Sequence, residues 1–368
     1  MAEIGPNTRL RVSPYYEATV KDGVTAFSPY NKMLMPVSYG DPDAEYDRLM
    51  NAASQWDVAV QRQVEIKGPD AACLVQVVSV RDLSSISVGQ GMYVPMCDHR
   101  GVLINDPVIL KLSENHFWLS IADNNILLWV RAIASERGFR VDIIEPDVSP
   151  MAVQGPNAED VVAATFGDWV REIRFFWFVD AEIEGIPLKL ARSGYSKQGG
   201  FELYLMDGSR GVDLWNIVRE AGRPWGIGPG YPYPTERIEG GILSFGGDTD
   251  DLTNPFEVRL GKYVDLGLDD DVIGIKALRA IHSEGVTRQL LGAILEDQPR
   301  HPGHPVWYEV QKDASKVGHM TNGVWSFRRR TMVGFVLVST DVHVGDRVEV
   351  LRNGERDAGT ICDLPFPE

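Results

Sequence analysis

The sequence predicts a protein of the α+β class, with two related α+β halves followed by a small all-β unit. A chain of 368 residues has room for two or three domains, each able to bury its own core. The segment QVEIKGPDAACLVQVV at 63–78 recurs in outline as MAVQGPNAEDVVAATFG at 151–167, which indicates two halves of one design. From Thr287 onward the chain changes to short apolar strands with tight turns, a pattern typical of a small barrel or sandwich.

The repeated segment reads each time as a short apolar strand, a Gly-Pro turn and a short helix. Asp70 and Asn157 follow the two Gly-Pro pairs and are suited to cap the N-terminus of a helix. The alternative interpretation is a chance likeness at a common strand-to-helix turn. Further helices are predicted to begin near Asp123 and to span 211–221 and 235–245.

Composition and charge restrict the classes of function. The 44% hydrophobic and 24% charged content is ordinary for a soluble globular protein, and the net charge of −16 argues against a nucleic-acid partner. The opening residues lack the apolar core of a signal peptide, and no run is long enough to cross a membrane. Cys73, Cys97 and Cys362 are few, odd in number and far apart, so neither a disulfide framework nor a thiolate metal site is expected. We therefore expect a cytoplasmic protein without a membrane partner.

The stretch from Met92 to Leu112 is predicted to form a β-hairpin with a polar turn at 98–101. Asp106 lies among aliphatic residues in its second strand, where a carboxylate loses hydration unless a hydrogen bond replaces it. Two interpretations stay open. Asn105, Asp106 and Pro107 form a local turn or bulge, or Asp106 binds a polar ligand at the edge of a core.

A second hairpin is predicted at 191–205, ARSGYSKQGGFELYL, as a strand, a Gly-rich turn and a strand. Alternation places Glu202 and Tyr204 on one face and apolar side chains on the other, so this pair is either a solvated sheet face or part of a site. Ser196 lacks the final glycine of a nucleophile elbow, which makes it a poor candidate for acyl chemistry. The aromatic run RFFWF at 174–178 is predicted to be a strand, with core rings favoured over a ligand platform.

The patterns typical of other cofactors are weak. The loop GIGPGYPYP at 226–234 contains prolines and lacks the strand-turn-helix register of a dinucleotide fingerprint. Leu252 falls where an EF-hand needs its third ligand. His301 and His304 are separated by Pro and Gly, and no metal site is expected there. The basic run at 328–330 is interpreted as a solvated hairpin tip, with binding of a small anion as the alternative.

The order of these segments resembles the aminomethyltransferase family, which comprises the glycine-cleavage T-protein and its folate-dependent relatives. The resemblance covers nearly the whole chain through YNKMLMP near Tyr30, QWDVAVQRQVEIKGPD, the Asp106 hairpin, the Glu202 strand, ERIEGGILSFGGD and the terminal TICDLPF. Within the family, SKQGG at 196–200 and Asn105 are more similar to the demethylases that act on dimethylsulfoniopropionate than to T-proteins. T-proteins usually carry GYTGEDGFE and a second aspartate at these places. Tyr233 aligns with the T-protein arginine that helps hold the folate tail, so the tail contacts are left open.

The resemblance implies a three-lobed fold with tetrahydrofolate in a central channel. Residues 1–50 and 145–232 would form a first α+β, folate-binding lobe. Residues 51–144 and 233–280 would form a second α+β lobe with the central hairpin. Residues 281–368 would form a C-terminal β-barrel.

The resemblance also implies a set of site residues. Asp106 and Glu202 match the carboxylates that hold the pterin ring, and a pterin does present N–H donors to carboxylates and a flat ring to aromatic faces. Asp106 and Tyr204 are the implied catalytic residues. The implied folate contacts are Tyr93, Asp106, Phe176, Glu202 and Tyr204. The implied donor contacts are Tyr30, Tyr195 and Tyr204, and Tyr93 and Trp118 are further aromatic candidates for binding a cationic donor.

The implied reaction is redox-neutral methyl transfer from dimethylsulfoniopropionate to N5 of tetrahydrofolate. A sulfonium leaves as a neutral thioether and needs no general acid, so we expect no metal, flavin or nicotinamide. Three alternatives stay open: a related enzyme acting on a methylated amine such as glycine betaine, an aminomethyltransferase acting on a lipoyl carrier, and a folate-binding module without catalysis. The expected partners are a small-molecule methyl donor and tetrahydrofolate, and a homodimer is left open.

Overall fold

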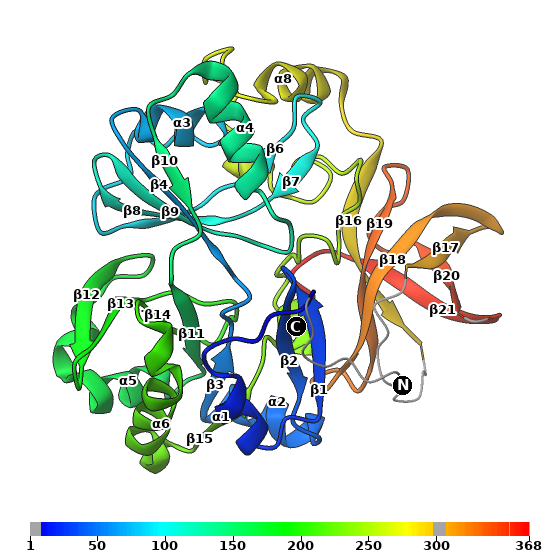
Figure 1. Ribbon diagram of the computed structural model, residues 1–368. Coiled ribbons are helices and arrows are strands. Elements are labelled where there is room, and N and C mark those ends of the chain that lie inside the picture. The colour runs from blue at the N-terminus through cyan, green and yellow to red at the C-terminus, as the bar shows by residue number, and fades with distance from the viewer. Residues whose placement is uncertain (1–8, 297–306, 353, 368) are drawn as a thin grey trace. The chain divides into compact units, whose positions relative to one another are not determined.

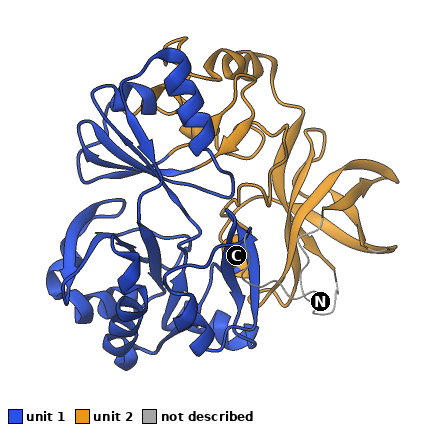
Figure 2. Cartoon of the chain, in the orientation of Figure 1, with its two compact units in different colours: residues 1–75, 84–93, 107–233 blue, residues 76–83, 94–106, 234–368 orange. Residues whose placement is uncertain are grey.

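The computed structural model describes residues 9–296, 307–352 and 354–367, so His301 and His304 lie outside the described residues. The chain separates into two compact units (Figure 2). Unit 1 consists of Met1–Val75, Ser84–Tyr93 and Pro107–Tyr233, and unit 2 consists of Gln76–Leu83, Val94–Asp106 and Pro234–Glu368. The boundaries expected for three lobes remain a prediction.

Unit 1 contains two large β-sheets (Figure 1). The six-stranded sheet has, in order across it, β12 (Phe178–Ile183), β13 (Ile186–Ala191), β14 (Gly200–Leu205), β11 (Ser149–Gln154), β3 (Ala53–Asp57) and β15 (Ile227–Gly230). The five-stranded sheet has β10 (Asp142–Ile144), β4 (Gln63–Lys67), β9 (His116–Ser120), β8 (Val108–Ser113) and β5 (Gly91–Tyr93). Neighbouring strands are antiparallel except β15, which runs parallel to β3. The chain before β3 forms α1 (Tyr16–Lys21), a hairpin of β1 (Ala26–Tyr30) and β2 (Met33–Ser38), and α2 (Pro42–Asn51).

Both copies of the repeated segment have the predicted strand, turn and helix. Strand β4 leads into α3 (Ala71–Val77), and strand β11 leads into α5 (Ala158–Phe166). Gly68 and Gly155 have φ angles of +145° and +123°, and an added Cβ would lie 2.5 Å from a backbone carbonyl oxygen in each case. Both turns therefore require glycine. Asn157 is the N-cap residue of α5, as predicted, but its side chain makes no capping hydrogen bond and donates instead to the Trp225 carbonyl at 3.1 Å.

Helices cover one face of the six-stranded sheet. Helices α5 and α6 (Gly211–Ala221) bury Val161 and Leu214 in the same cluster as Phe201 and Leu203 of β14. The helix predicted at 211–221 is therefore confirmed. The opposite face of β14 is left to Glu202 and Tyr204, because side chains alternate along a strand.

Three predicted elements differ from the structure. The helix expected near Asp123 is α4 (Leu127–Arg137), and the helix expected at 235–245 is the shorter α7 (Pro234–Glu239). The strand expected from Arg174 begins only at Phe178, because residues 175 and 176 form a turn.

In the predicted hairpin from Met92 to Leu112, each of the two strands is divided into two shorter strands. Strand β5 pairs with β8, and β6 (Met96–Cys97) pairs with β7 (Leu103–Asn105). Asp106 and Pro107 lie between β7 and β8, which agrees with the interpretation of a local break in the strand. The chain passes between units at 93/94 and at 106/107.

Unit 2 contains the predicted all-β part as a closed barrel. Its strands are, in order around the barrel, β16 (Arg288–Leu295), β19 (Thr331–Ser339), β18 (Ser315–Ser326), β17 (Tyr308–Lys312), β20 (Arg347–Arg352) and β21 (Glu355–Cys362). The basic run at 328–330 lies in the turn between β18 and β19, as predicted for a hairpin tip. Unit 2 also contains α7 and α8 (Ile275–Glu284).

A buried carboxylate connects the N-terminal segment to the six-stranded sheet. Asp57 ends β3 and is only 1% exposed. Its Oδ2 accepts the Ser13 hydroxyl at 2.5 Å, and its Oδ1 accepts the Ala59 backbone N–H at 3.2 Å. Burial outweighs these two bonds and raises the pKa of Asp57 to about 6.

Replacing Asp57 by Asn should remove a pH dependence of stability. Because the folded-state pKa is above the ordinary value of 3.8, the folded protein binds the proton more tightly than the unfolded chain does. The contribution of Asp57 is fully present below about pH 4 and is lost as the pH rises through about 6, which amounts to roughly 2–3 kcal/mol. Urea unfolding measured across this pH range should show that the free energy of unfolding falls in the wild type and not in Asp57→Asn.

The matched control is Ser13→Ala. Since the Ser13 hydrogen bond lowers the pKa of Asp57, its loss should extend the fall in stability to higher pH. Parallel stability profiles for the wild type and Asp57→Asn would contradict this assignment.

Candidate functional site

The site lies where the two sheets of unit 1 meet. The rings of Trp118 on β9 and Tyr204 on β14 are 6.4 Å apart between centroids. Both belong to one apolar cluster, whose buried members are Leu110, Trp118, Val148, Phe178, Ala191 and Tyr204. The Ser120 hydroxyl of β9 is hydrogen-bonded to Tyr204, and the Gln63 amide donates to Ser120 Oγ at 3.0 Å. Side chains from both sheets therefore surround the Tyr204 hydroxyl.

Glu202 is a buried carboxylate beside Tyr204, as the alternation in sequence predicted. It is 6% exposed, and its Oε2 accepts both the Ser193 hydroxyl at 2.5 Å and the Tyr204 hydroxyl at 3.2 Å. Among the described residues, no hydrogen bond reaches its other oxygen, Oε1. The carboxylate thus keeps one oxygen available to accept N–H groups from a ligand.

Burial controls the protonation of this pair. Burial raises the pKa of Glu202, and the hydrogen bonds from Ser193 and Tyr204 partly oppose that rise. Burial and the neighbouring Glu202 charge raise the pKa of Tyr204 well above its ordinary value. Tyr204 therefore stays protonated at neutral pH and acts as a hydrogen-bond donor to Glu202.

The turn before β14 is held by the fully buried side chain of Gln154. Its Nε2 donates to the Ser193 carbonyl at 3.1 Å, and its Oε1 accepts the Ser196 hydroxyl at 2.8 Å. Gly200 packs directly on this strand, because an added Cβ would lie 2.2 Å from the Val153 carbonyl oxygen. The turn thereby fixes Ser193 next to Glu202.

Replacing Gly200 by Ala should destabilise the protein far more than replacing its neighbour Gly199. Both glycines have positive φ, at +155° and +80°, but an added Cβ at Gly199 meets no atom within 4 Å. We expect Gly199→Ala to cost about 1 kcal/mol of backbone strain and Gly200→Ala to cost more than about 2 kcal/mol. Chemical denaturation measures both losses, and equal losses would contradict the close packing at Gly200.

Phe176 has a backbone conformation that side chains rarely adopt. Its φ is +60°, at a cost of about 1–3 kcal/mol, and its backbone bonds hold it there. Its N–H donates to the Arg192 carbonyl at 2.9 Å, and its carbonyl accepts the Gly91 N–H at 2.7 Å. Strand β5, which contains Gly91, also carries Tyr93. Phe176 and the strand of Tyr93 are thus joined, and both side chains are half-buried.

Three further predicted residues come from other segments of the chain. Tyr30 ends β1 and packs half-buried against the main core of unit 1, and Tyr195 is half-buried in the turn before β14. Asp106 is half-buried, and its backbone N–H donates to Asn105 Oδ1 at 3.0 Å. Asp106 belongs to unit 2, so its action together with Glu202 on one ligand remains a prediction.

Sequence reasoning missed Ser193, Gln154 and Lys189. The roles of Ser193 and Gln154 depend on the conformation of the turn before β14, which no local sequence pattern indicates. Lys189 was detectable, because a lysine inside the apolar strand IPLKLA is as unusual as an aspartate in a strand. In the structure Lys189 faces the same side as Tyr204, to which it is paired in register.

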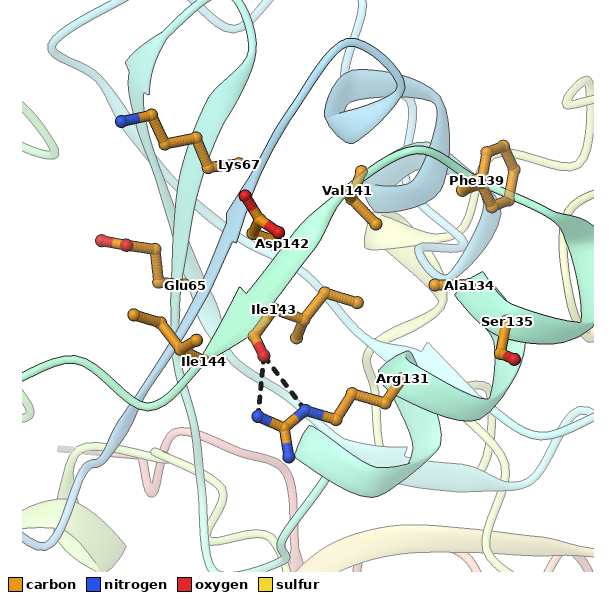
Figure 3. Close-up of a pocket in the computed structure, with 10 residues that line it drawn as sticks. All are labelled: Glu65, Lys67, Arg131, Ala134, Ser135, Phe139, Val141, Asp142, Ile143 and Ile144. Atoms are coloured by element: carbon orange, nitrogen blue, oxygen red, sulfur yellow. Dashed lines mark hydrogen bonds between the residues drawn. The ribbon is translucent and has the colours of Figure 1, made fainter.

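A separate pocket of about 600 Å³ lies between β4, β10 and α4 (Figure 3). Acidic and basic side chains both line it, and Arg131 is held there by donating two N–H groups to the Ile143 carbonyl at 3.0 and 2.7 Å. Glu65 connects the pocket to the Tyr204 site, since its Oε2 accepts the Trp118 indole N–H at 2.7 Å. None of the predicted folate contacts lines this pocket, so it is distinct from the predicted site.

Two general features of the described residues also bear on function. No group of three or more His, Cys, Asp or Glu side chains there is arranged to hold a metal ion. Over the same residues, no helix combines the length and apolarity that a membrane span requires.

Comparison with known proteins identifies the family. Residues 15–267 match the GCVT N-terminal domain, and residues 288–367 match the glycine cleavage T-protein C-terminal barrel domain. The dimethylsulfoniopropionate demethylase of Ruegeria pomeroyi is 40% identical over 326 residues, which cover 89% of this chain and 88% of that protein. An aminomethyltransferase of Caldanaerobacter subterraneus is 29% identical over 366 residues, which cover 97% and 96% of the two chains.

A solved structure supports the fold. The glycine cleavage system aminomethyltransferase T from Bartonella henselae superposes with a TM-score of 0.84 at 21% identity, covering 97% of this chain and 98% of that one. The predicted α+β fold with a C-terminal barrel is confirmed, and so is the prediction of an enzyme. The chain belongs to the glycine cleavage T-protein family of tetrahydrofolate-dependent transferases.

Proposed function

We propose that this protein transfers a methyl group from dimethylsulfoniopropionate to N5 of tetrahydrofolate. The observation that carries the proposal is the 40% identity to a dimethylsulfoniopropionate demethylase over 89% of the chain. The aminomethyltransferases, at 29% identity over nearly the full length, support the alternative of an amine donor.

The geometry around Glu202 supports folate as the acceptor. A pterin ring presents adjacent N–H donors, and Glu202 uses only Oε2 for its hydrogen bonds to Ser193 and Tyr204, which leaves Oε1 to accept from a ligand. Such donors would favour the ionised carboxylate, whose pKa is otherwise raised by burial. Asp106 is proposed as the second carboxylate. Tyr93 and Phe176 are proposed as aromatic contacts of the folate, and Tyr30 and Tyr195 as contacts of the donor.

The proposed reaction is a direct displacement. The N5 lone pair forms a bond to the methyl carbon while the carbon–sulfur bond breaks, and sulfur leaves with the electron pair as a neutral thioether. The methylated N5 then releases its proton, for which Asp106 is the proposed acceptor. Tyr204 orients Glu202 through its hydroxyl group and offers its ring face to the sulfonium. Holding the reacting atoms in line can supply several kcal/mol of barrier lowering in such a step.

Removing either proposed carboxylate should weaken folate binding without unfolding the protein. We expect Glu202→Ala and Asp106→Ala each to raise the dissociation constant for tetrahydrofolate by about tenfold or more, because a charge-assisted hydrogen bond is lost. Isothermal titration calorimetry measures this change. Glu182→Ala is the matched control, since Glu182 is an exposed carboxylate on β12 of the same sheet. Unchanged affinity in both site variants would remove the pterin site from this location.

The donor preference tests the reaction itself. Dimethylsulfoniopropionate should be turned over well above glycine betaine or dimethylglycine, because an ammonium is a much poorer methyl donor than a sulfonium. Purified protein with tetrahydrofolate, donor and a metal chelator should form 5-methyltetrahydrofolate, measured by chromatography. Equal or faster turnover of an amine donor would favour the alternative function, and a requirement for added metal or flavin would contradict direct displacement.

A further inference from the structure

Lys189 places a buried positive charge beside Tyr204. It lies on β13 directly opposite Tyr204 in the antiparallel register, and its neighbour Ala191 lies opposite Glu202. Paired side chains on adjacent strands share a face, with their Cβ atoms about 5 Å apart. Lys189 is 9% exposed. Its ammonium group therefore belongs to the same face of the sheet as the proposed donor contact.

The surroundings of this ammonium group are mostly aromatic. Its Nζ lies 5.6 Å from the centre of the Trp118 ring and 5.8 Å from that of Phe178. Among the described residues, Asp180 is its only hydrogen-bond acceptor, although a lysine ammonium carries three donors. Two donors are thus available in a setting where an unsatisfied charge is costly.

The partner Asp180 is poorly suited to stabilise a buried cation. Its side chain is 83% exposed, and exposed ion pairs contribute little. The pair of Arg237 and Asp248 in unit 2 shows the contrast, because that aspartate is fully buried and also accepts the Thr321 hydroxyl at 2.8 Å. The Lys189 ammonium group is therefore suited to bind an additional anion.

We propose that Lys189 binds the carboxylate of the methyl donor and so makes the site selective for onium compounds that carry a carboxylate. The inference rests on the proposed function and names the substrate class of that same site. In dimethylsulfoniopropionate two methylene groups separate the sulfonium from the carboxylate. With the carboxylate on Lys189 Nζ, the sulfonium reaches the neighbouring Tyr204 ring, where cation–π attraction holds it. A donor without a carboxylate leaves the Lys189 charge uncompensated.

The competing explanation is that Lys189 only spans the aromatic surface to reach Asp180, with a role in stability. The two explanations differ for Asp180. If the ion pair is the whole role of Lys189, then Asp180→Asn should have the same effect as Lys189→Gln. If Lys189 binds the donor, Asp180→Asn should leave donor selectivity intact, because the ammonium group remains.

The test compares dimethylsulfoniopropionate with its methyl ester at saturating tetrahydrofolate, with 5-methyltetrahydrofolate measured by chromatography. Wild type should use the acid with a kcat/KM about tenfold or more above that for the ester. Lys189→Gln should raise KM for the acid by about tenfold or more, with kcat within about threefold, and should change the ester little. Lys189→Arg should recover most of the selectivity, and Asp180→Asn should keep it.

Several results would overturn the assignment. These are equal use of acid and ester by the wild type, an equal loss on both donors in Lys189→Gln, or a loss of selectivity in Asp180→Asn. The first comparison needs no variant, so it can overturn the assignment even if circular dichroism shows that Lys189→Gln fails to fold. Lys189→Arg and Asp180→Asn then test whether the selectivity comes from Lys189. Failure of the proposed function has a different signature, because the wild type would then form no 5-methyltetrahydrofolate from either sulfonium donor.

Discussion

The site depends on keeping one carboxylate, Glu202, buried between two sheets. Burying a charge without partners is costly, and the chain provides Ser193 and Tyr204 as donors to a single oxygen. That arrangement requires the Ser193 turn to lie close to β14, which in turn requires Gln154 beneath it and glycine at Gly200. The irregular turn thus provides one of the two donors that the buried carboxylate requires.

The same close packing occurs in both halves of unit 1. Gly68 and Gly155 each begin a turn after a central strand, and each lies where a Cβ would meet a backbone carbonyl oxygen. A Gly-Pro pair followed by a helix was readable in the sequence, so the repeat predicted both strand-to-helix units correctly. The N-cap position of Asn157 was predicted, but the partner of its side chain was not, because Trp225 comes from a distant segment.

Local alternation was enough to place Glu202 and Tyr204 on one face, since a strand has a strict period of two. It could not show that Trp118 and Ser120 approach Tyr204, because these residues belong to another sheet. Asp106 was recognised from its apolar neighbours, and a break between β7 and β8 accounts for part of that pattern. Its role in binding is implied by the family resemblance and remains a prediction.

The protonation of Tyr204 favours orientation over proton transfer. Tyr204 remains a phenol at neutral pH, because burial and the Glu202 charge both oppose its ionisation. Glu202 is satisfied on one oxygen and available on the other. A phenol with so high a pKa gains little by exchanging protons with a ligand at neutral pH, so Tyr204 is suited to binding and orientation. Transfer of a methyl group from a sulfonium requires orientation above all, because the leaving thioether is neutral. The electrostatics of the Glu202 and Tyr204 pair therefore suit the displacement reaction proposed above.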